Sequence, residues 1–118
     1  MTGIADPGEE AHDCAVREVA EETGVAVRPA AIIGVGAIGP VTHSNGDLAS
    51  YMTVQLRMEP LDPQAQPVVG DDESLEVGWF PISQMPVTDP KWRLVIADAA
   101  AQRRHPEGFA PRMGLVKR

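Results

Sequence analysis

The sequence predicts an α/β (α+β) fold in which helices pack against a sheet and cover its hydrophobic faces. Three observations support this: a capped helical segment near the N-terminus, two β-rich segments around an Asn-Gly turn, and a second capped helical segment near the C-terminus. The 118 residues correspond to one domain, and 43% of them are apolar, which suffices for a modest core.

The first helix is predicted from its capping residues. Asp6 is a suitable N-cap, Pro7 fits the first helical position, and Glu9 completes a capping box. We expect the helix to end near Thr23, because Gly24 can adopt the left-handed conformation just beyond a helix end.

The middle of the chain predicts a β-hairpin. Residues 31–41 are rich in β-branched residues and glycine, and Asn45-Gly46 predicts a type I′ turn. The next segment alternates, so that its apolar residues share one face: Met52, Val54, Leu56 and Met58. Residues 59–72 form a proline-rich loop, and residues 75–80 are predicted to form a short strand.

A second helix is predicted to begin at Asp89-Pro90, with apolar residues at helical spacing and two arginines, Arg103 and Arg104, at its end. We expect residues 1–105 to form the domain and residues 106–118 to be a loosely ordered tail.

Composition excludes several classes of protein. The single cysteine, Cys14, excludes an internal disulfide and a cysteine zinc site, and it favours a reducing, cytoplasmic location. No apolar run reaches the ~18 residues of a membrane span, so we expect no membrane partner. The net charge of −7 argues against a nucleic acid polymer as partner.

Most of that negative charge lies in residues 6–22, and three of the acids share one helical arc. With Glu18 at zero on a helical wheel, Glu22 lies at about +40° and Glu21 at about −60°. Like charges at i,i+4 repel, and the end of a helix is already negative. Arg17 can pair with Glu21, which leaves two carboxylates uncompensated. Mg²⁺ or Mn²⁺ would compensate them; a solvated acidic helix face is the alternative.

The spacing of these residues resembles a known family signature. Gly3, Glu9 and the run Arg17-Glu18-Val19-Ala20-Glu21-Glu22-Thr23-Gly24-Val25 match the Nudix box, Gly-x5-Glu-x7-Arg-Glu-aliphatic-x-Glu-Glu-x-Gly-aliphatic, at every specified position. The resemblance implies a Nudix-type α/β/α sandwich with a mixed sheet. It also implies a Mg²⁺- or Mn²⁺-dependent hydrolase that cleaves the pyrophosphate bond of a nucleoside diphosphate linked to another group.

The resemblance assigns roles to the box residues. Glu18 and Glu22 match the main metal ligands, Glu21 matches a direct or water-mediated ligand, and the carbonyl of Gly3 matches a backbone ligand. In some family members the residue matching Glu18 is instead the base. Glu9, Arg17 and Gly24 match residues that support the box.

Candidates outside the box each have a plainer alternative. Many members carry a further acid on a loop, and Asp72 and Glu73 are the candidates here; the alternative is a solvated turn. His43 and Arg57 are candidate substrate contacts, and ordinary exposed polar residues are the alternative.

The box begins at Gly3, whereas two or three strands precede it in typical members, so the resemblance implies an N-terminally incomplete domain. We expect a fragment of a longer protein or an obligate oligomer such as a homodimer, because an open sheet edge invites association. A tail that folds back over the sheet is the third option.

The substrate stays open among ADP-ribose, dinucleoside polyphosphates, nucleoside triphosphates and nucleotide sugars. A catalytically silent Nudix-derived module that binds a nucleotide or a partner is the alternative function. The complete set of box carboxylates favours the hydrolase, and the missing strands favour the module.

Overall fold

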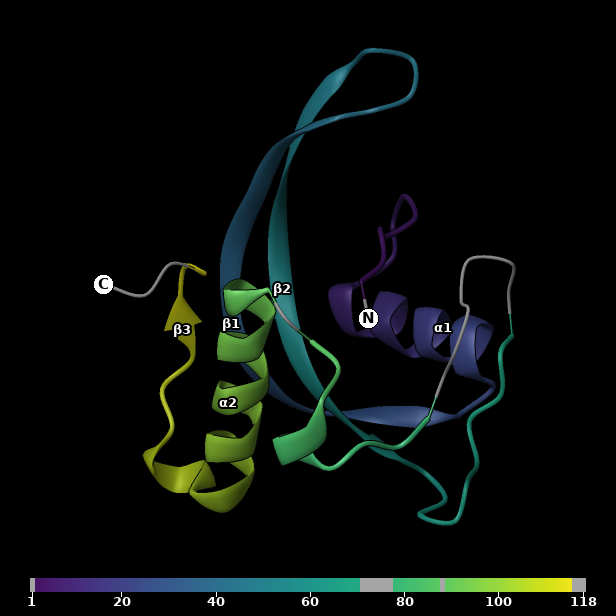
Figure 1. The fold of residues 1–118 in the computed structure, drawn as a ribbon, viewed down its shortest axis with the longest axis vertical. Helices are drawn as coiled ribbons and strands as arrows, with labels where there is room; N and C mark the ends of the chain where they lie inside the picture. Colours follow the sequence, from purple (N-terminus) through teal and green to yellow (C-terminus); the bar gives the residue numbers. More distant parts are fainter. Residues whose placement is uncertain (1, 71–77, 88, 116–118) are drawn as a thin grey trace. The chain divides into compact units, whose positions relative to one another are not determined.

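The computed structural model describes residues 2–70, 78–87 and 89–115. The elements in these ranges are α1 (Ala11–Thr23), β1 (Val27–Thr42), β2 (Leu48–Pro60), the 3₁₀ turn η1 (Ile82–Gln84), α2 (Pro90–Arg104), the 3₁₀ turn η2 (Pro106–Gly108) and β3 (Arg112–Met113). β1 lies between β2 and β3, and Figure 1 shows β1 and β2 as one long hairpin. β3 runs parallel to β1, so the sheet is mixed, and the predicted α+β class is confirmed.

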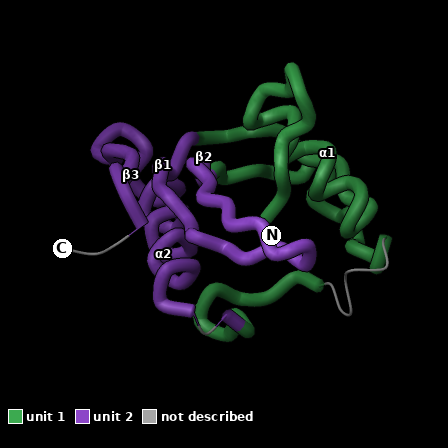
Figure 2. Tube along the Cα trace, turned by 90° about the horizontal axis from the view of Figure 1, so that it is seen from above, with its two compact units in different colours: residues 1–31, 56–86 green, residues 32–55, 87–118 purple. Residues whose placement is uncertain are grey.

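The chain divides into two compact units (Figure 2). The first contains residues 1–31 and 56–86, with α1 and the open end of the hairpin; the buried apolar residues among those described are Cys14, Val25 and Val27. The second contains residues 32–55 and 87–118, with the turn of the hairpin, α2 and β3; its described residues include the buried apolar side chains of Ile33, Ala100 and Leu115. All the box residues therefore belong to the first unit.

The start of α1 differs from the prediction. The helix begins at Ala11 with Glu10 as its N-cap, not with Asp6, and no side chain caps it. The reason is Gly8, whose φ of 81° closes a separate turn in which Glu9 N–H donates to Asp6 O. Glu9 Oε1 still accepts a hydrogen bond from Asp6 N–H, so the reciprocal contact of a capping box forms ahead of the helix. The predicted end at Thr23 is confirmed, with Gly24 at φ 72°.

The hairpin forms, but its turn is not type I′. That type requires positive φ at both central residues, and among the described residues only glycines have positive φ. Gly46 N–H donates to His43 O, and Gly46 itself is left-handed at φ 90°. The turn is therefore a type I turn followed by a left-handed glycine, which joins the strands equally well.

The alternation predicted for β2 is present, but the apolar face is the more open one. Met52 is 81% exposed, whereas Gln55 is buried and donates a hydrogen bond from Nε2 to Thr53 Oγ1 at 2.5 Å. A period of two separates the faces of a strand without saying which of them is covered.

The C-terminal part contains the predicted helix and an additional strand. Asp89 caps α2 by accepting from Lys91 N–H at 2.9 Å, as predicted. The expectation of a loose tail is wrong for residues 106–115, because β3 pairs with β1 in the register Gly34–Arg112 and Val35–Met113. Gly34 has no side chain to separate the two backbones, and a methyl carbon there would lie 2.7 Å from Arg112 O.

An ion pair between Arg112 on β3 and Asp98 in the middle of α2, with Nε 2.6 Å from Oδ2, joins the strand to the helix. The predicted strand at 75–80 is not seen in residues 78–80, and its other residues lie outside the described ranges. Within the described ranges, no helix combines the length and the apolar character that crossing a membrane requires.

Candidate active site

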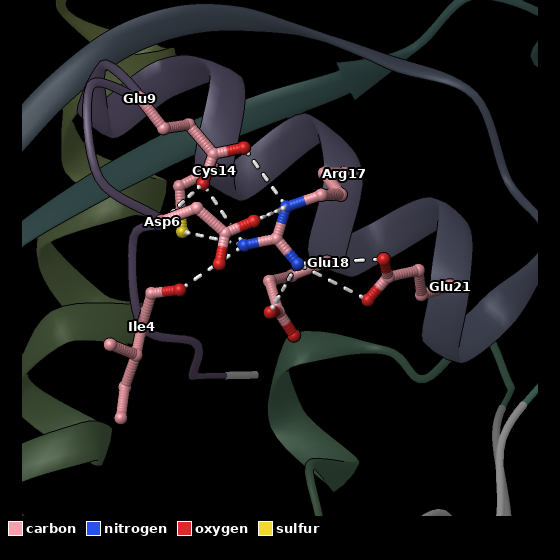
Figure 3. A network of polar contacts seen from close by, with 7 residues as sticks. All are labelled: Ile4, Asp6, Glu9, Cys14, Arg17, Glu18 and Glu21. Carbon is pink, nitrogen blue, oxygen red and sulfur yellow. Dashed lines mark hydrogen bonds and ion pairs between the residues drawn. The ribbon is translucent and has the colours of Figure 1, made fainter.

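Arg17 is the centre of the polar network on α1 (Figure 3). Its guanidinium makes a two-point contact with Glu9, Nε to Oε2 at 2.9 Å and Nη2 to Oε1 at 3.0 Å. Nη1 donates to Glu18 Oε1 at 2.9 Å and lies 3.3 Å from Glu21 Oε2. Nη2 also donates to the backbone oxygen of Ile4 at 3.1 Å. One cation therefore joins three box carboxylates and the chain ahead of the helix.

This network changes the charge balance that the sequence suggested. The predicted pair of Arg17 with Glu21 is present, but the expectation that Glu18 would stay uncompensated is wrong, because the same nitrogen also binds Glu18. The guanidinium is planar with several fixed donors, so it can hold neighbouring carboxylates at once. Glu18 and Glu21 are thereby kept on one side of α1 despite their like charge.

The contacts within the network shift the pKa values of Glu9, Arg17 and Cys14. The hydrogen bonds from Arg17, followed by the one from Asp6 N–H, lower the pKa of Glu9 to about 2, from an ordinary value of 4.5. Hydrogen bonding to Glu9 raises the pKa of Arg17. Burial, followed by the charge of Glu9, raises the pKa of the Cys14 thiol, so the thiol stays protonated and is not a nucleophile.

Gly3 lies directly against the Glu18 side chain. A methyl carbon at position 3 would be 2.6 Å from Glu18 Cδ and 3.1 Å from Oε1, so any larger residue would displace the Glu18 side chain or the backbone at position 3. The contact brings backbone at Gly3 next to a carboxylate that is only 21% exposed. Carboxylate and backbone oxygens are the hard donors that Mg²⁺ and Mn²⁺ prefer.

The oxygen atoms of this site fit Mg²⁺, which keeps several water ligands, better than a metal ion that is bound by protein side chains alone. In the part of the chain that the structure describes, no three Asp, Glu, His or Cys side chains are gathered as a ready ligand set. Mg²⁺ commonly uses one or two carboxylates and completes its shell with waters and substrate phosphates. Glu18 beside Gly3, with Glu21 held by the same arginine, matches that pattern.

Comparison with known proteins agrees with the signature and this geometry. The model of the NUDIX domain matches residues 1–103. The chain belongs to the Nudix family. Proteins named NAD-capped RNA hydrolase NudC, from two strains of Pseudomonas putida and from Pseudomonas entomophila, are 35%, 34% and 33% identical to it over 88 residues. The match covers 73% of this chain and 28% of each relative's length.

Two parts of the chain donate hydrogen bonds to the last backbone carbonyls of α1. Gly24 N–H donates to Ala20 O at 2.9 Å, as expected for a left-handed glycine after a helix. Val68 and Gly70, from the loop after β2, donate backbone N–H groups to Thr23 O and Glu22 O at 2.8 and 3.0 Å. The sequence analysis missed Gly70; a lone glycine near the end of the Pro-rich loop was its one signal.

Of the four candidate residues outside the Nudix box, the structure places two, and each of these two contacts another side chain. Asp72 and Glu73 lie outside the described residues. Arg57 is mostly buried, and its Nη1 lies 2.8 Å from Oε1 of Glu59. The other carboxylate oxygen of Glu59, Oε2, forms an ion pair with Arg28. His43, in the second unit, contacts the Tyr51 hydroxyl through Nε2 at 2.6 Å. Both residues thus have protein partners, and their contact with substrate stays a prediction.

Proposed function

We propose that this chain hydrolyses the pyrophosphate bond of a nucleoside diphosphate linked to a second group, with Mg²⁺ or Mn²⁺ as cofactor. The observation that carries the proposal is the placement of Glu18 between the Arg17 guanidinium and the Gly3 backbone. A helix face that was merely solvated would have no need for that close approach. Membership of the Nudix family and the complete box support the same conclusion.

In this proposal Glu18 and Glu22 hold the metal, with Glu21 and the carbonyl of Gly3 as further ligands. The bound ion would neutralise the phosphate oxygens and lower the pKa of a bound water. Arg17 orients Glu18 and Glu21 through its Nη1, and Glu9 fixes the arginine by its two-point contact. Gly24 supports the box by ending α1 just after the proposed ligands Glu21 and Glu22.

The attacking water also needs a proton acceptor. We assign that role to Asp72 or Glu73, with Glu18 as the alternative that some family members use. His43 and Arg57 are the candidate contacts to substrate. Comparing Asp72→Asn and Glu73→Gln, under conditions in which metal binding is unchanged, identifies the base by its loss of turnover.

The relatives suggest which substrate class to test first. Their name refers to RNA that carries an NAD cap, and NAD is two nucleotides joined through a pyrophosphate. We therefore propose a dinucleotide pyrophosphate as the preferred class and, because the net charge of −7 disfavours a polymer, the small molecule over capped RNA. A location in the reducing cytoplasm fits this class and the single cysteine.

The competing function is a catalytically silent module that binds nucleotide. One observation favours it: Arg17 already compensates the charges of Glu18 and Glu21, so these two carboxylates need no metal to lie side by side. Silent binding predicts that nucleotide raises the melting temperature while no product forms.

The deciding experiment is an assay of product release on NAD, ADP-ribose, a dinucleoside polyphosphate, a nucleoside triphosphate, a nucleotide sugar and NAD-capped RNA, each with Mg²⁺ or Mn²⁺. We expect the NAD class to be cleaved at its pyrophosphate, and metal to raise the melting temperature by mass action. Glu22→Gln is the matched negative control. Absence of product from every substrate, together with a melting curve insensitive to millimolar metal, would refute the hydrolase.

A further inference from the structure

The last turn of α1 carries Glu21 and Glu22, and its backbone carbonyls are almost fully used. An α-helix leaves its last four carbonyls without partners inside the helix. Here Gly24 N–H donates to Ala20 O, the first of these four, at 2.9 Å, and Thr23 Oγ1 donates to Val19 O, one residue earlier, at 2.7 Å. These two bonds come from the helix end itself.

The remaining carbonyls face residues 68–70, which we call the helix-end seat. Val68 N–H donates to Thr23 O at 2.8 Å, and Gly70 N–H donates to Glu22 O at 3.0 Å. Glu21 O faces Gly70 so closely that a methyl carbon at position 70 would overlap it. That methyl would also lie 3.2 Å and 3.3 Å from the carbonyl carbons of Glu21 and Glu22. Glycine is therefore required for the seat to form as it does.

The loop that leads to the seat is held by two hydrogen bonds, one at Leu61 and one at Ala65. Leu61 N–H donates to Ala26 O at 3.0 Å where the loop begins. Trp79 Nε1 donates to Ala65 O at 2.9 Å from beyond the loop. Residues 68–70 thus contact the helix from a loop that is held in place, not as a chance surface contact.

This helix end needs support for an electrostatic reason. Carboxylates near a helix C-terminus are unfavourable because the helix dipole is negative there, and Glu18 and Glu22 repel each other at i,i+4. Terminal turns fray readily. Two backbone N–H donors from the seat stabilise the turn at the residues that the proposed metal site uses.

We propose that Gly70 is a positioning residue for the metal site, acting through the backbone of Glu21 and Glu22. The inference rests on the proposed function, because it assigns the seat to the same metal-binding carboxylates. Gly70 need not touch metal or substrate. By keeping the last turn of α1 helical, it fixes the backbone positions from which the Glu21 and Glu22 side chains extend.

The first test measures Mn²⁺ affinity by titration followed with electron paramagnetic resonance, in the full chain without substrate. Gly70→Ala should weaken Mn²⁺ binding by about tenfold or more, the usual effect of disturbing groups that orient metal ligands. Gly78→Ala is the matched control in the same unit, because its methyl would meet, among the described residues, only the Phe80 ring at an ordinary 3.5 Å. It should bind Mn²⁺ as the unmodified chain does.

A second test needs no substitution and so holds even if Gly70→Ala fails to fold. Amide hydrogen exchange at Val68 and Gly70 is followed with and without Mg²⁺. If opening of the seat releases metal, Mg²⁺ at ten times its dissociation constant slows exchange at both amides about 11-fold. A seat whose local opening leaves the metal bound predicts no change in exchange through that opening on adding metal.

The outcomes separate this inference from the proposed function. Unmodified chain that binds no Mn²⁺ refutes the metal site and the inference with it. Mn²⁺ binding that is equal in Gly70→Ala and the unmodified chain, or amide exchange that Mg²⁺ does not slow, overturns the inference alone and leaves the hydrolase proposal standing.

Discussion

Replacing Gly3 by alanine tests whether the close approach of the backbone to Glu18 is needed for the chemistry. The added methyl would lie 2.6 Å from Glu18 Cδ, whereas carbon atoms in contact normally lie about 3.5–4.0 Å apart. Residues 2–4 or the Glu18 carboxylate must therefore move by about 1 Å. A misplacement of that size can cost about 100-fold in rate, so we expect turnover to fall by about that factor.

The stability of the fold should change little, because Gly3 is exposed and a surface substitution usually alters the free energy of unfolding by no more than about 0.5 kcal/mol. The assay measures product release at saturating substrate alongside Mn²⁺ affinity, and the melting temperature without metal is the check on folding. Gly108→Ala is the control, since no atom of the residues that the structure describes, apart from its chain neighbours, lies within 4 Å of its added methyl. Wild-type turnover and Mn²⁺ affinity in Gly3→Ala would show that the Gly3–Glu18 contact has no part in the site.

Three further predictions follow from the same structure. Glu22→Gln should remove most turnover while the melting temperature without metal is retained, because a ligand charge is lost and the repulsion from Glu18 is relieved; full activity in this variant would exclude Glu22 as a ligand. The depressed pKa of Glu9 stabilises the fold above its ordinary value of 4.5, and this contribution is lost as pH falls toward about 2. Melting curves between those pH values should therefore show a steeper loss in the unmodified chain than in Glu9→Gln, and parallel curves would contradict this. Gly34→Ala should separate β3 from β1 and cost about 1–3 kcal/mol; the check is faster amide exchange at Gly114, whose N–H donates to Val35 O, and unchanged exchange would refute it.

The residues of the box and the end of its helix were predictable from the sequence, because they depend on local spacing. The 3.6-residue period alone places Glu18, Glu21 and Glu22 on one arc. The left-handed conformation of Gly24 follows from what only glycine tolerates easily after a helix. The cap of α2 at Asp89 was likewise set by two adjacent residues, Asp89 and Pro90.

Local signals failed where a neighbouring residue changed the outcome. Asp6 has the chemistry of an N-cap, yet the left-handed Gly8 two residues later closes a turn and delays the helix to Ala11. The Asn45-Gly46 pair predicted a turn correctly but not its type, since several turns can join two strands.

Only the tertiary structure decided the contacts between residues far apart in the chain. Arg17 reaches Ile4 O and Glu9 as well as Glu18, and no helical spacing specifies that choice among several acids. The approaches of Gly3 to Glu18, of Gly70 to the end of α1 and of Arg112 to Gly34 join segments that nothing in their local sequence pairs. The sequence by itself determined the helix and the positions of the proposed ligands on it, because these depend on residues close together along the chain. The surroundings of those ligands depend on chain packing, which brings distant backbone within contact distance.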